Sequence, residues 1–288
     1  MLLTNHYPVA DVVPYINWAY FFHAWGFPAR FATIAHIHGC DSCRATWLAQ
    51  FPESDRARAS EAMQLFKEAQ RFLRVHAAGH QSHFRFLLTD CHAESDDVVI
   101  GQTRLAFLRQ QRPPFLCLAD FVSPESDRIG LFAVSVDEAF ERMFEGEDDY
   151  RHLMAQTLAD RLAEATAELA HEHVRKFDWG YAILERLSIP DLLSEKFQGI
   201  RPAVGYPSMP DQSLNFDLDR MLDFSSIGIR LTESGAMVPH ASVSGLMMAH
   251  PKAQYFSVGR IGEDQLADYA RRRGLSVDVI RQFLAGNL

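Results

Sequence analysis

The segment 147–176 constrains the fold more than any other stretch, because it predicts one long amphipathic helix. It begins with a run of acids and ends with basic Arg175 and Lys176, which matches the dipole of a helix at both ends. Its apolar residues recur at helical spacing: Met154, Leu158, Leu162, Ala165 and Leu169. Since such a stripe must be buried, the segment predicts a core built against one face of this helix.

Other patterns predict a sheet beside that helix. Strands are expected at 83–89, 116–122, 128–136, 237–248 and 254–261. Helices are expected at 55–74, 263–273 and 277–285, the last two ending at a glycine. Because the strands cluster between helices without strict alternation, we predict an α+β fold around a mainly antiparallel sheet.

Composition excludes several function classes. At 288 residues, with 48% apolar and 23% charged content, the chain has ample material for a core. A net charge of −9 argues against nucleic acid and against an anionic membrane surface as partners. No window is apolar enough to span a membrane, and the first residues do not form a secretory signal. Four cysteines are too few for a disulfide scaffold, so we expect a cytoplasmic protein.

The heptapeptide 201–207, Arg-Pro-Ala-Val-Gly-Tyr-Pro, predicts a stiff loop. Two prolines restrict its backbone, and Gly205 between them can adopt conformations closed to other residues. The loop carries one permanent planar cation, Arg201, whose guanidinium suits a carboxylate. A plain surface turn has the same composition, so spacing alone leaves both interpretations open.

Several motifs in register resemble the activation domain of cobalamin-dependent methionine synthase. They are Gln198-Gly199-Ile200 leading into the heptapeptide, Leu231-Thr232-Glu233-Ser234-Gly235-Ala236-Met237, Ala241-Ser242-Val243-Ser244-Gly245, Ala159-Asp160-Arg161-Leu162-Ala163-Glu164-Ala165, Trp179-Gly180-Tyr181-Ala182 and Tyr15-Ile16-Asn17-Trp18. The resemblance is strong after residue 115 and weak between 26 and 105. It implies one curved domain over residues 1–288, around a mainly antiparallel sheet with flanking helices.

The resemblance implies S-adenosylmethionine as the ligand. Arg201 matches the family arginine that grips the ligand carboxylate, and Ala203 the residue whose backbone contacts the ligand. Glu164 and Tyr255 match further ligand residues, although a solvated glutamate and an ordinary strand aromatic would look the same in sequence. Tyr206 matches the tyrosine on the side that faces cobalamin. No catalytic residue and no metal ligand are implied.

Two positions depart from the family pattern. Asn17 stands where the family usually has an aspartate, and an asparagine keeps an acceptor but loses the charge. Gln212 stands where the family often has a histidine, on the side that faces cobalamin. Weaker or altered ligand binding is one consequence open at this point.

Residues 36–43 contain four metal-competent side chains, at His36, His38, Cys40 and Cys43. Zinc accepts such ligands, and a Cys-x-x-Cys pair can also be redox-active. A plain loop is the simpler interpretation, since the resemblance is weakest here. The run 90–95 begins like a cobalamin-binding motif, but Ser95 stands in place of its glycine, so cobalamin is expected only through a partner.

We therefore expect a free-standing reactivation module that is not catalytic alone. In the family, cobalamin is occasionally oxidised to an inactive form. The activation domain then presents S-adenosylmethionine to the corrin while a flavodoxin-like partner delivers an electron. The expected partners are a corrinoid protein or truncated methionine synthase and that electron donor. One alternative is a binding or assembly protein that kept the fold and lost the reaction; another is a metal-dependent enzyme using residues 36–43.

Overall fold

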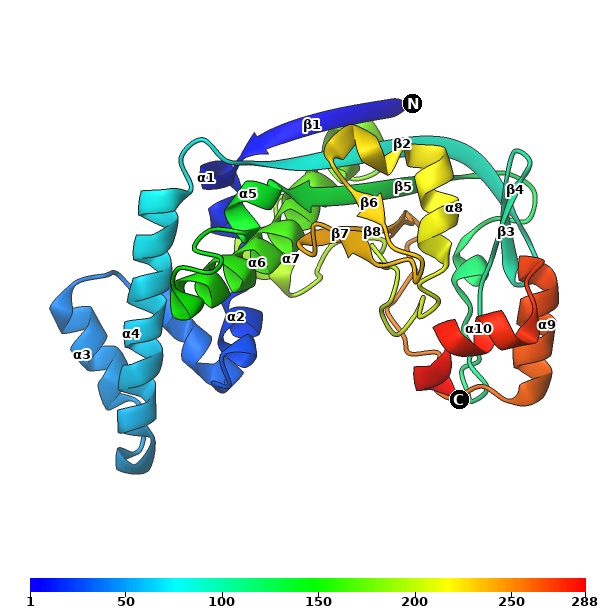
Figure 1. The fold of residues 1–288 in the computed structure, drawn as a ribbon. Coiled ribbons are helices and arrows are strands. Elements are labelled where there is room, and N and C mark those ends of the chain that lie inside the picture. Colours follow the sequence, from blue (N-terminus) through cyan, green and yellow to red (C-terminus); the bar gives the residue numbers. More distant parts are fainter.

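The computed structural model describes residues 1–288. Strands and helices alternate irregularly along the chain (Figure 1). The strands are β1 Leu2–Pro8, β2 Gln81–Glu94, β3 Asp97–Ile100, β4 Thr103–Ala106, β5 Asp127–Val136, β6 Arg230–Leu231, β7 Met237–Val238 and β8 Ser242–Met247. The α-helices are α1 Val9–Val12, α2 Trp18–Ala24, α3 Asp41–Ala49, α4 Glu53–His76, α5 Glu138–Glu141, α6 Asp149–His173, α7 Ile189–Leu193, α8 Leu214–Leu222, α9 Glu263–Arg273 and α10 Val277–Phe283.

The main sheet has six strands, all antiparallel to their neighbours. Its order is β4-β3-β2-β5-β8, and β1 pairs with β2 as well. The long strand β2 organises it, because β5 runs along one edge while β1 and β3 share the other. This arrangement confirms the predicted α+β fold around an antiparallel sheet.

Helix α6 covers one face of the sheet and α8 the other. On β2, alternate residues Phe84, Phe86 and Leu88 are buried in the same core cluster as Leu158 and Leu162 of α6. On the opposite face, the Arg85 Nε donates a hydrogen bond to the carbonyl of Leu222, at the end of α8 (2.8 Å). The predicted stripe of α6 is therefore part of the main core.

The molecule forms an arch (Figure 1). The sheet lies across its top, α2, α3 and α4 make one arm, and α9 and α10 make the other. Residues 200–210 lie below β8, inside the arch. No helix is long and apolar enough to cross a membrane.

Most predicted helices are confirmed. α4 and α9 match their expected ranges closely, and α10 is followed by a 3-10 turn over Ala285–Asn287. The helix expected at 147–176 is α6, continued by a π-helical turn over Val174–Asp178. The segment 36–43, expected as a loop, is irregular at 37–40 and flanked by the end of a 3-10 helix, Ala29–His36, and the start of α3.

Three expected strands are wrong in extent or kind. Residues 116–122 contain a 3-10 helix, Leu118–Phe121, because the Asp120 carboxylate accepts the Cys117 amide hydrogen and closes a capping turn. Residues 254–261 form no strand: the Val258 amide bonds to a loop carbonyl at Pro207 rather than to a strand. Residues 237–248 divide into β7 and β8 around Pro239, which has no amide hydrogen for a ladder.

Strand β2 is longer than expected. It continues through 90–94, which sequence analysis interpreted as a polar loop, and Ala93 pairs there with Val98 of β3. Ser95 follows with a φ of 54°, in the turn to β3. Strand β1 had no counterpart in the prediction.

Candidate functional site

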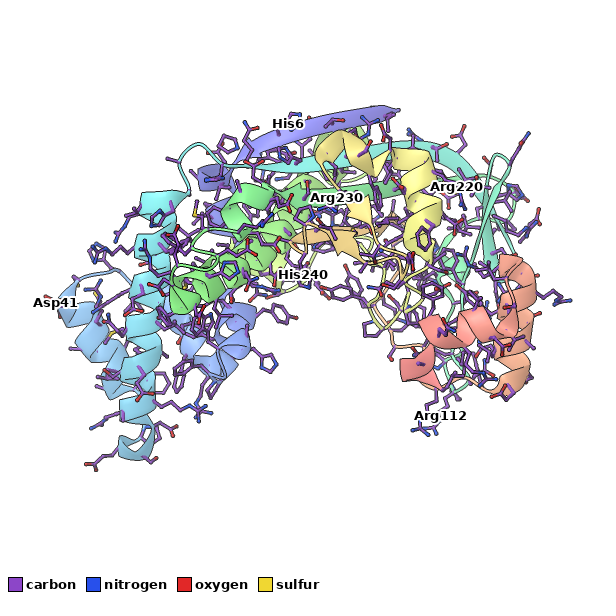
Figure 2. The ribbon with its side chains drawn as sticks, viewed as in Figure 1. His6, Asp41, Arg112, Arg220, Arg230 and His240 are labelled. Carbon is purple, nitrogen blue, oxygen red and sulfur yellow. The ribbon has the colours of Figure 1, made fainter.

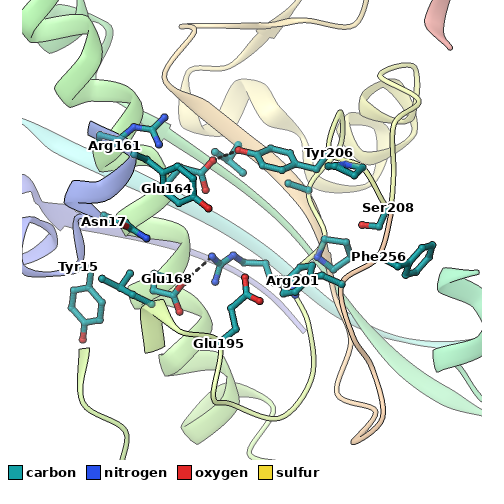
Figure 3. Close-up of a pocket in the computed structure, with 18 of the residues that line it drawn as sticks. Tyr15, Asn17, Arg161, Glu164, Glu168, Glu195, Arg201, Tyr206, Ser208 and Phe256 are labelled. Atoms are coloured by element: carbon teal, nitrogen blue, oxygen red, sulfur yellow. Dashed lines mark hydrogen bonds and ion pairs between the residues drawn. The ribbon is translucent and has the colours of Figure 1, made fainter. Parts of the chain in front are cut away.

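One cavity of about 550 Å3 collects the residues that sequence analysis singled out (Figure 3). Its lining includes all six expected site residues: Asn17, Glu164, Arg201, Ala203, Tyr206 and Tyr255. They come from the start of α2, the middle of α6, the loop 201–207 and the segment after β8. The fold therefore brings together positions that lie far apart in sequence.

The stiff loop is attached to β8 by backbone hydrogen bonds. Leu246 donates to the carbonyl of Pro202, and Val204 donates to the carbonyl of Ser244, both at 2.9 Å. The approach requires Gly245, since a Cβ there would lie 2.2 Å from the Pro202 oxygen. Gly205 then turns the chain with a φ of 87°, a region that favours glycine. These contacts hold Arg201 and Tyr206 on the sheet rather than on a mobile turn.

Arg201 is anchored by α6. Its Nη2 donates to the Glu168 carboxylate (3.0 Å), and its Nη1 lies 3.3 Å from the Nδ1 of His171. The Arg201 side chain is only 11% exposed, so the ion pair is largely shielded from water. Two of the five guanidinium hydrogens are used in this way, which leaves three for another acceptor.

Glu164, Glu168 and His171 occupy one face of α6, because positions four and three apart follow each other along a helix. Glu164 is half-buried and faces the cavity, which the helical periodicity of the sequence could not distinguish from a solvated position. Glu168 is 7% exposed, and its Oε1 is buried without a hydrogen-bond partner. A cationic or hydrogen-donating ligand group would satisfy that oxygen.

His171 acts as a neutral acceptor for Arg201. Burial lowers the pKa of His171 well below its ordinary value, and the neighbouring Arg201 and Arg175 lower it further. With Arg201 donating to Nδ1, the single proton of the neutral ring lies on Nε2, towards the hydroxyl of Tyr181. Arg201 is thus held by one charged partner and one neutral partner.

Tyr206 lies between this cavity and a second, smaller one of about 250 Å3, and lines both. Its hydroxyl donates to the Glu164 carboxylate (Figure 3). Glu164 also lines both cavities. Gln212 and His240 line only the smaller cavity, on the concave side of the arch where Figure 2 labels His240. Burial, followed by the nearby Glu164, raises the pKa of Tyr206, so its hydroxyl remains a donor.

Tyr255 and Asn17 have structural partners of their own. The Tyr255 hydroxyl accepts a hydrogen bond from the backbone amide of Arg201 (2.9 Å), which supports the loop. The Asn17 side-chain oxygen accepts from the amide of Ala19 (3.1 Å) and caps α2. Its amide nitrogen is left for the cavity, so Asn17 combines a capping role with a place in the lining.

The cavity lining is mildly acidic. Glu164, Glu168 and Glu195 face Arg161 and Arg201, which leaves one uncompensated negative charge when every carboxyl is ionised. Burial raises the pKa of Glu195, and the nearby Glu168 raises it further. Such a lining favours a ligand with one net positive charge and a carboxylate near Arg201.

Sequence analysis did not identify Glu168 and His171. Both lie on the predicted helix, but nothing local shows that this face meets Arg201, which is 33 residues from Glu168 and 30 from His171 along the chain. The cluster formed by His38, Cys40 and Cys43 lies on the arm made by α2–α4, outside the cavity lining.

The architecture places the chain in a definite structural class: an α+β fold in which helices flank a curled antiparallel half-barrel sheet. The family model described as "Vitamin B12 dependent methionine synthase, activation domain" matches residues 8–274. The chain belongs to this family. It is also similar to a solved structure described as "Crystal Structure of the MetH Reactivation Domain bound to AdoHcy". The identity is 36%, the TM-score is 0.85, and the match covers 100% of this chain and 90% of that one.

Proposed function

We propose that this protein binds S-adenosylmethionine in the 550 Å3 cavity and supports the reductive methylation of cobalamin held on a separate chain, a methionine synthase or other corrinoid protein. The observation that carries the proposal is that one cavity is lined by the five positions matched to the family ligand site together with Tyr206, which is matched to the corrin-facing side. The similar MetH reactivation domain, whose structure is described as bound to AdoHcy, supports the choice of ligand.

The charges of the cavity fit this ligand. S-adenosylmethionine carries a sulfonium, an ammonium and a carboxylate, so its net charge is +1 and complements the mildly acidic lining. Arg201 would donate to the carboxylate with the hydrogens that Glu168 and His171 leave free. The unpartnered Oε1 of Glu168 would accept from the ammonium group. The demethylated product lacks the sulfonium charge, which favours its release.

Tyr206 and the second cavity would form the side that faces the corrin. Tyr206 is 49% exposed, although its hydroxyl reaches Glu164 inside the ligand cavity. A side chain that touches both spaces is placed to position the ligand methyl group against a docked cofactor. The protein would supply orientation, while reduced cobalt on the partner would be the nucleophile and a flavodoxin-like protein the electron donor. The free cysteines suit the cytoplasm, where we place the protein.

A binding or assembly protein without the reaction is the second candidate. The observations that favour it are the uncharged Asn17 in the ligand cavity and Gln212 in the smaller one. Both functions use the same ligand, so binding alone does not separate them.

Methyl transfer to a corrinoid protein separates the two. The assay mixes this protein, a reduced corrinoid protein and methyl-labelled S-adenosylmethionine, and follows the label onto cobalt. We expect Tyr206→Ala to impair transfer while ligand binding is retained, with Tyr206→Phe as the control that removes only the hydroxyl contact with Glu164. Equal transfer without the protein, or full transfer by Tyr206→Ala, would show that the docking assignment is wrong.

A further inference from the structure

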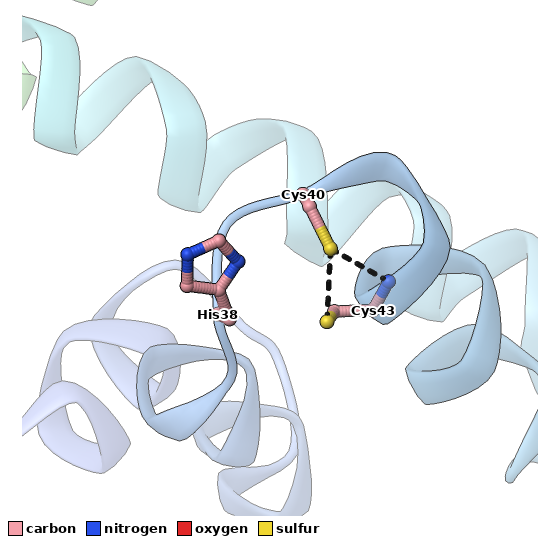
Figure 4. A group of neighbouring side chains, drawn as sticks. All are labelled: His38, Cys40 and Cys43. Atoms are coloured by element: carbon pink, nitrogen blue, oxygen red, sulfur yellow. Dashed lines mark hydrogen bonds between the residues drawn. The ribbon is translucent and has the colours of Figure 1, made fainter.

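The outer arm contains a group of soft metal ligands that the proposed function does not use. His38, Cys40 and Cys43 offer one nitrogen and two sulfurs, and these atoms all lie within 4.8 Å of one another (Figure 4). The cluster lies at the start of α3, whose first residue Asp41 is labelled at the outer edge of the arch in Figure 2. We propose that these three side chains form a binding site for a thiophilic divalent cation, with zinc as the best fit.

The first turn of α3 fixes the two cysteines. Cys40 is the N-cap residue, and its sulfur accepts a hydrogen bond from the backbone amide of Cys43 (3.3 Å). Both sulfurs therefore project from the first turn of one helix. His38 reaches the same point from the segment that precedes the helix.

The spacing fits zinc after a small side-chain movement. Zinc bonds of about 2.3 Å to sulfur and about 2.0 Å to nitrogen place tetrahedral ligand atoms roughly 3.5–3.8 Å apart. The two sulfurs are 2.9 Å apart as hydrogen-bonded thiols, so they need to separate by a little under 1 Å. The three ligating atoms already lie within 4.8 Å of one another, so each distance differs from the zinc geometry by about 1 Å, a shift on the scale of side-chain rotation.

The chemistry of the set favours a metal over a plain loop. Two thiols release two protons to solvent as two metal–sulfur bonds form, so two thiolates and a neutral imidazole neutralise a divalent cation. Three protein ligands leave a fourth position for water or another donor. The neighbouring charges, Asp41 and Arg44, pair with each other at 3.3 Å and do not occupy the cluster.

The site would hold the arm together. Trp47, 1% exposed on the same helix, donates from its indole nitrogen to the Thr33 hydroxyl (2.9 Å) in the preceding 3-10 helix. A metal joining His38 to the start of α3 would fix the short linker between these two helices. The bound metal would thus stabilise the arm and leave the ligand cavity unchanged.

Cobalt(II) titration tests the site directly. Full-length protein is reduced, stripped of metal and titrated with Co²⁺ alone, followed by Zn²⁺ as competitor. We expect one equivalent to bind with thiolate-to-cobalt charge-transfer absorption and the strong visible bands of tetrahedral coordination, and Zn²⁺ to abolish both. Cys40→Ser and Cys43→Ser should each lose the charge-transfer band, and His38→Ala should weaken binding at least tenfold.

His36→Ala is the matched control, because His36 is exposed nearby and is not among the three clustered ligands. It should titrate like the wild type, and circular dichroism should show that every variant is folded. The proposal is overturned if reduced wild-type protein gives no charge-transfer absorption with Co²⁺, or if the band survives in both serine variants. It is also overturned if Cys40 and Cys43 form a disulfide in the purified protein that persists under reductant and no metal binds.

Discussion

At the scale of single residues, the central feature is that contacts from α6 hold the Arg201 guanidinium in place without a ligand. Glu168 and His171 hold its guanidinium at 3.0 and 3.3 Å, so the ligand carboxylate of the proposed function would meet a side chain already ordered. The family resemblance singled out Arg201, since composition alone left its loop open to interpretation as a plain surface turn. The sequence could not indicate the two partners, because their role depends on a contact between distant parts of the chain.

Restoring the family aspartate at position 17 should tighten ligand binding. Asn17→Asp keeps an oxygen that can cap α2 and adds a negative charge in a cavity that would hold a cationic ligand. We expect a gain of about 1 kcal/mol, roughly fivefold in affinity, by titration calorimetry. Asn17→Ser is the control that keeps the cap without the charge. Unchanged or weaker binding by Asn17→Asp would indicate a diverged cavity and favour the second candidate function.

His171 should make the free energy of unfolding depend on pH. Its pKa is lowered in the folded state, so its contribution is fully present above the unfolded pKa of about 6.5. As the pH falls further, the unfolded state binds a proton that the folded state refuses, and stability is lost. The loss is at most about 1.4 kcal/mol per pH unit, until the folded pKa is reached.

Urea unfolding between pH 7 and pH 5 measures this effect. His171→Gln should show a smaller decrease in stability with falling pH than the wild type, whatever its absolute stability. His36→Gln, at an exposed position, is the control and should keep the wild-type slope. An equal slope in His171→Gln and the wild type would show that His171 is not held neutral.

At the scale of elements, sequence periodicity predicted the long helices well and the strands less well. α4 and α6 have apolar stripes that repeat over many helical turns, and a single capping turn or loop contact does not override so long a pattern. The segments 116–122 and 254–261 have strand-like composition, but a capping turn and loop contacts use their amides instead. β1 was missed because polar Asn5 and His6 lie in an exposed edge strand and break the apolar pattern.

Gly245 on β8 should be intolerant of any side chain. In Gly245→Ala the new Cβ would lie 2.2 Å from the Pro202 oxygen, so the loop that carries Arg201 must move away from the sheet. We expect a loss of about 1–3 kcal/mol in urea unfolding, together with weaker ligand binding. Gly286→Ala is the control, since a Cβ there meets nothing within 4 Å. Wild-type stability and affinity in Gly245→Ala would contradict the described packing of the loop.

At the scale of the whole molecule, the loop 201–207 lies on the concave side of the arch (Figure 1). Val204 and Tyr206 of this loop line the smaller cavity. A partner that enters the arch would meet Tyr206 and Gln212 together. The net charge of −9 favours a partner with a basic face, through faster association at low salt.

The isolated protein should contain no cobalamin. The run 90–95 lacks the glycine of a cobalamin-binding motif, and residues 90–94 are part of the ladder of β2. A purified sample should therefore be colourless. A corrinoid absorption spectrum that survives gel filtration would overturn the view that a second chain supplies the cofactor.

Titration calorimetry with S-adenosylmethionine tests the central claim most directly. We expect saturable binding to the wild type, and a loss of roughly 30- to 1000-fold in affinity in Arg201→Ala, as removal of a charge-assisted bidentate contact costs about 2–4 kcal/mol. Arg112→Ala, at an exposed position on the arm of α9 and α10 (Figure 2), is the control. Thermal unfolding checks that both variants fold. No heat from the folded wild type at millimolar ligand, or equal affinity in Arg201→Ala and the wild type, would contradict the account.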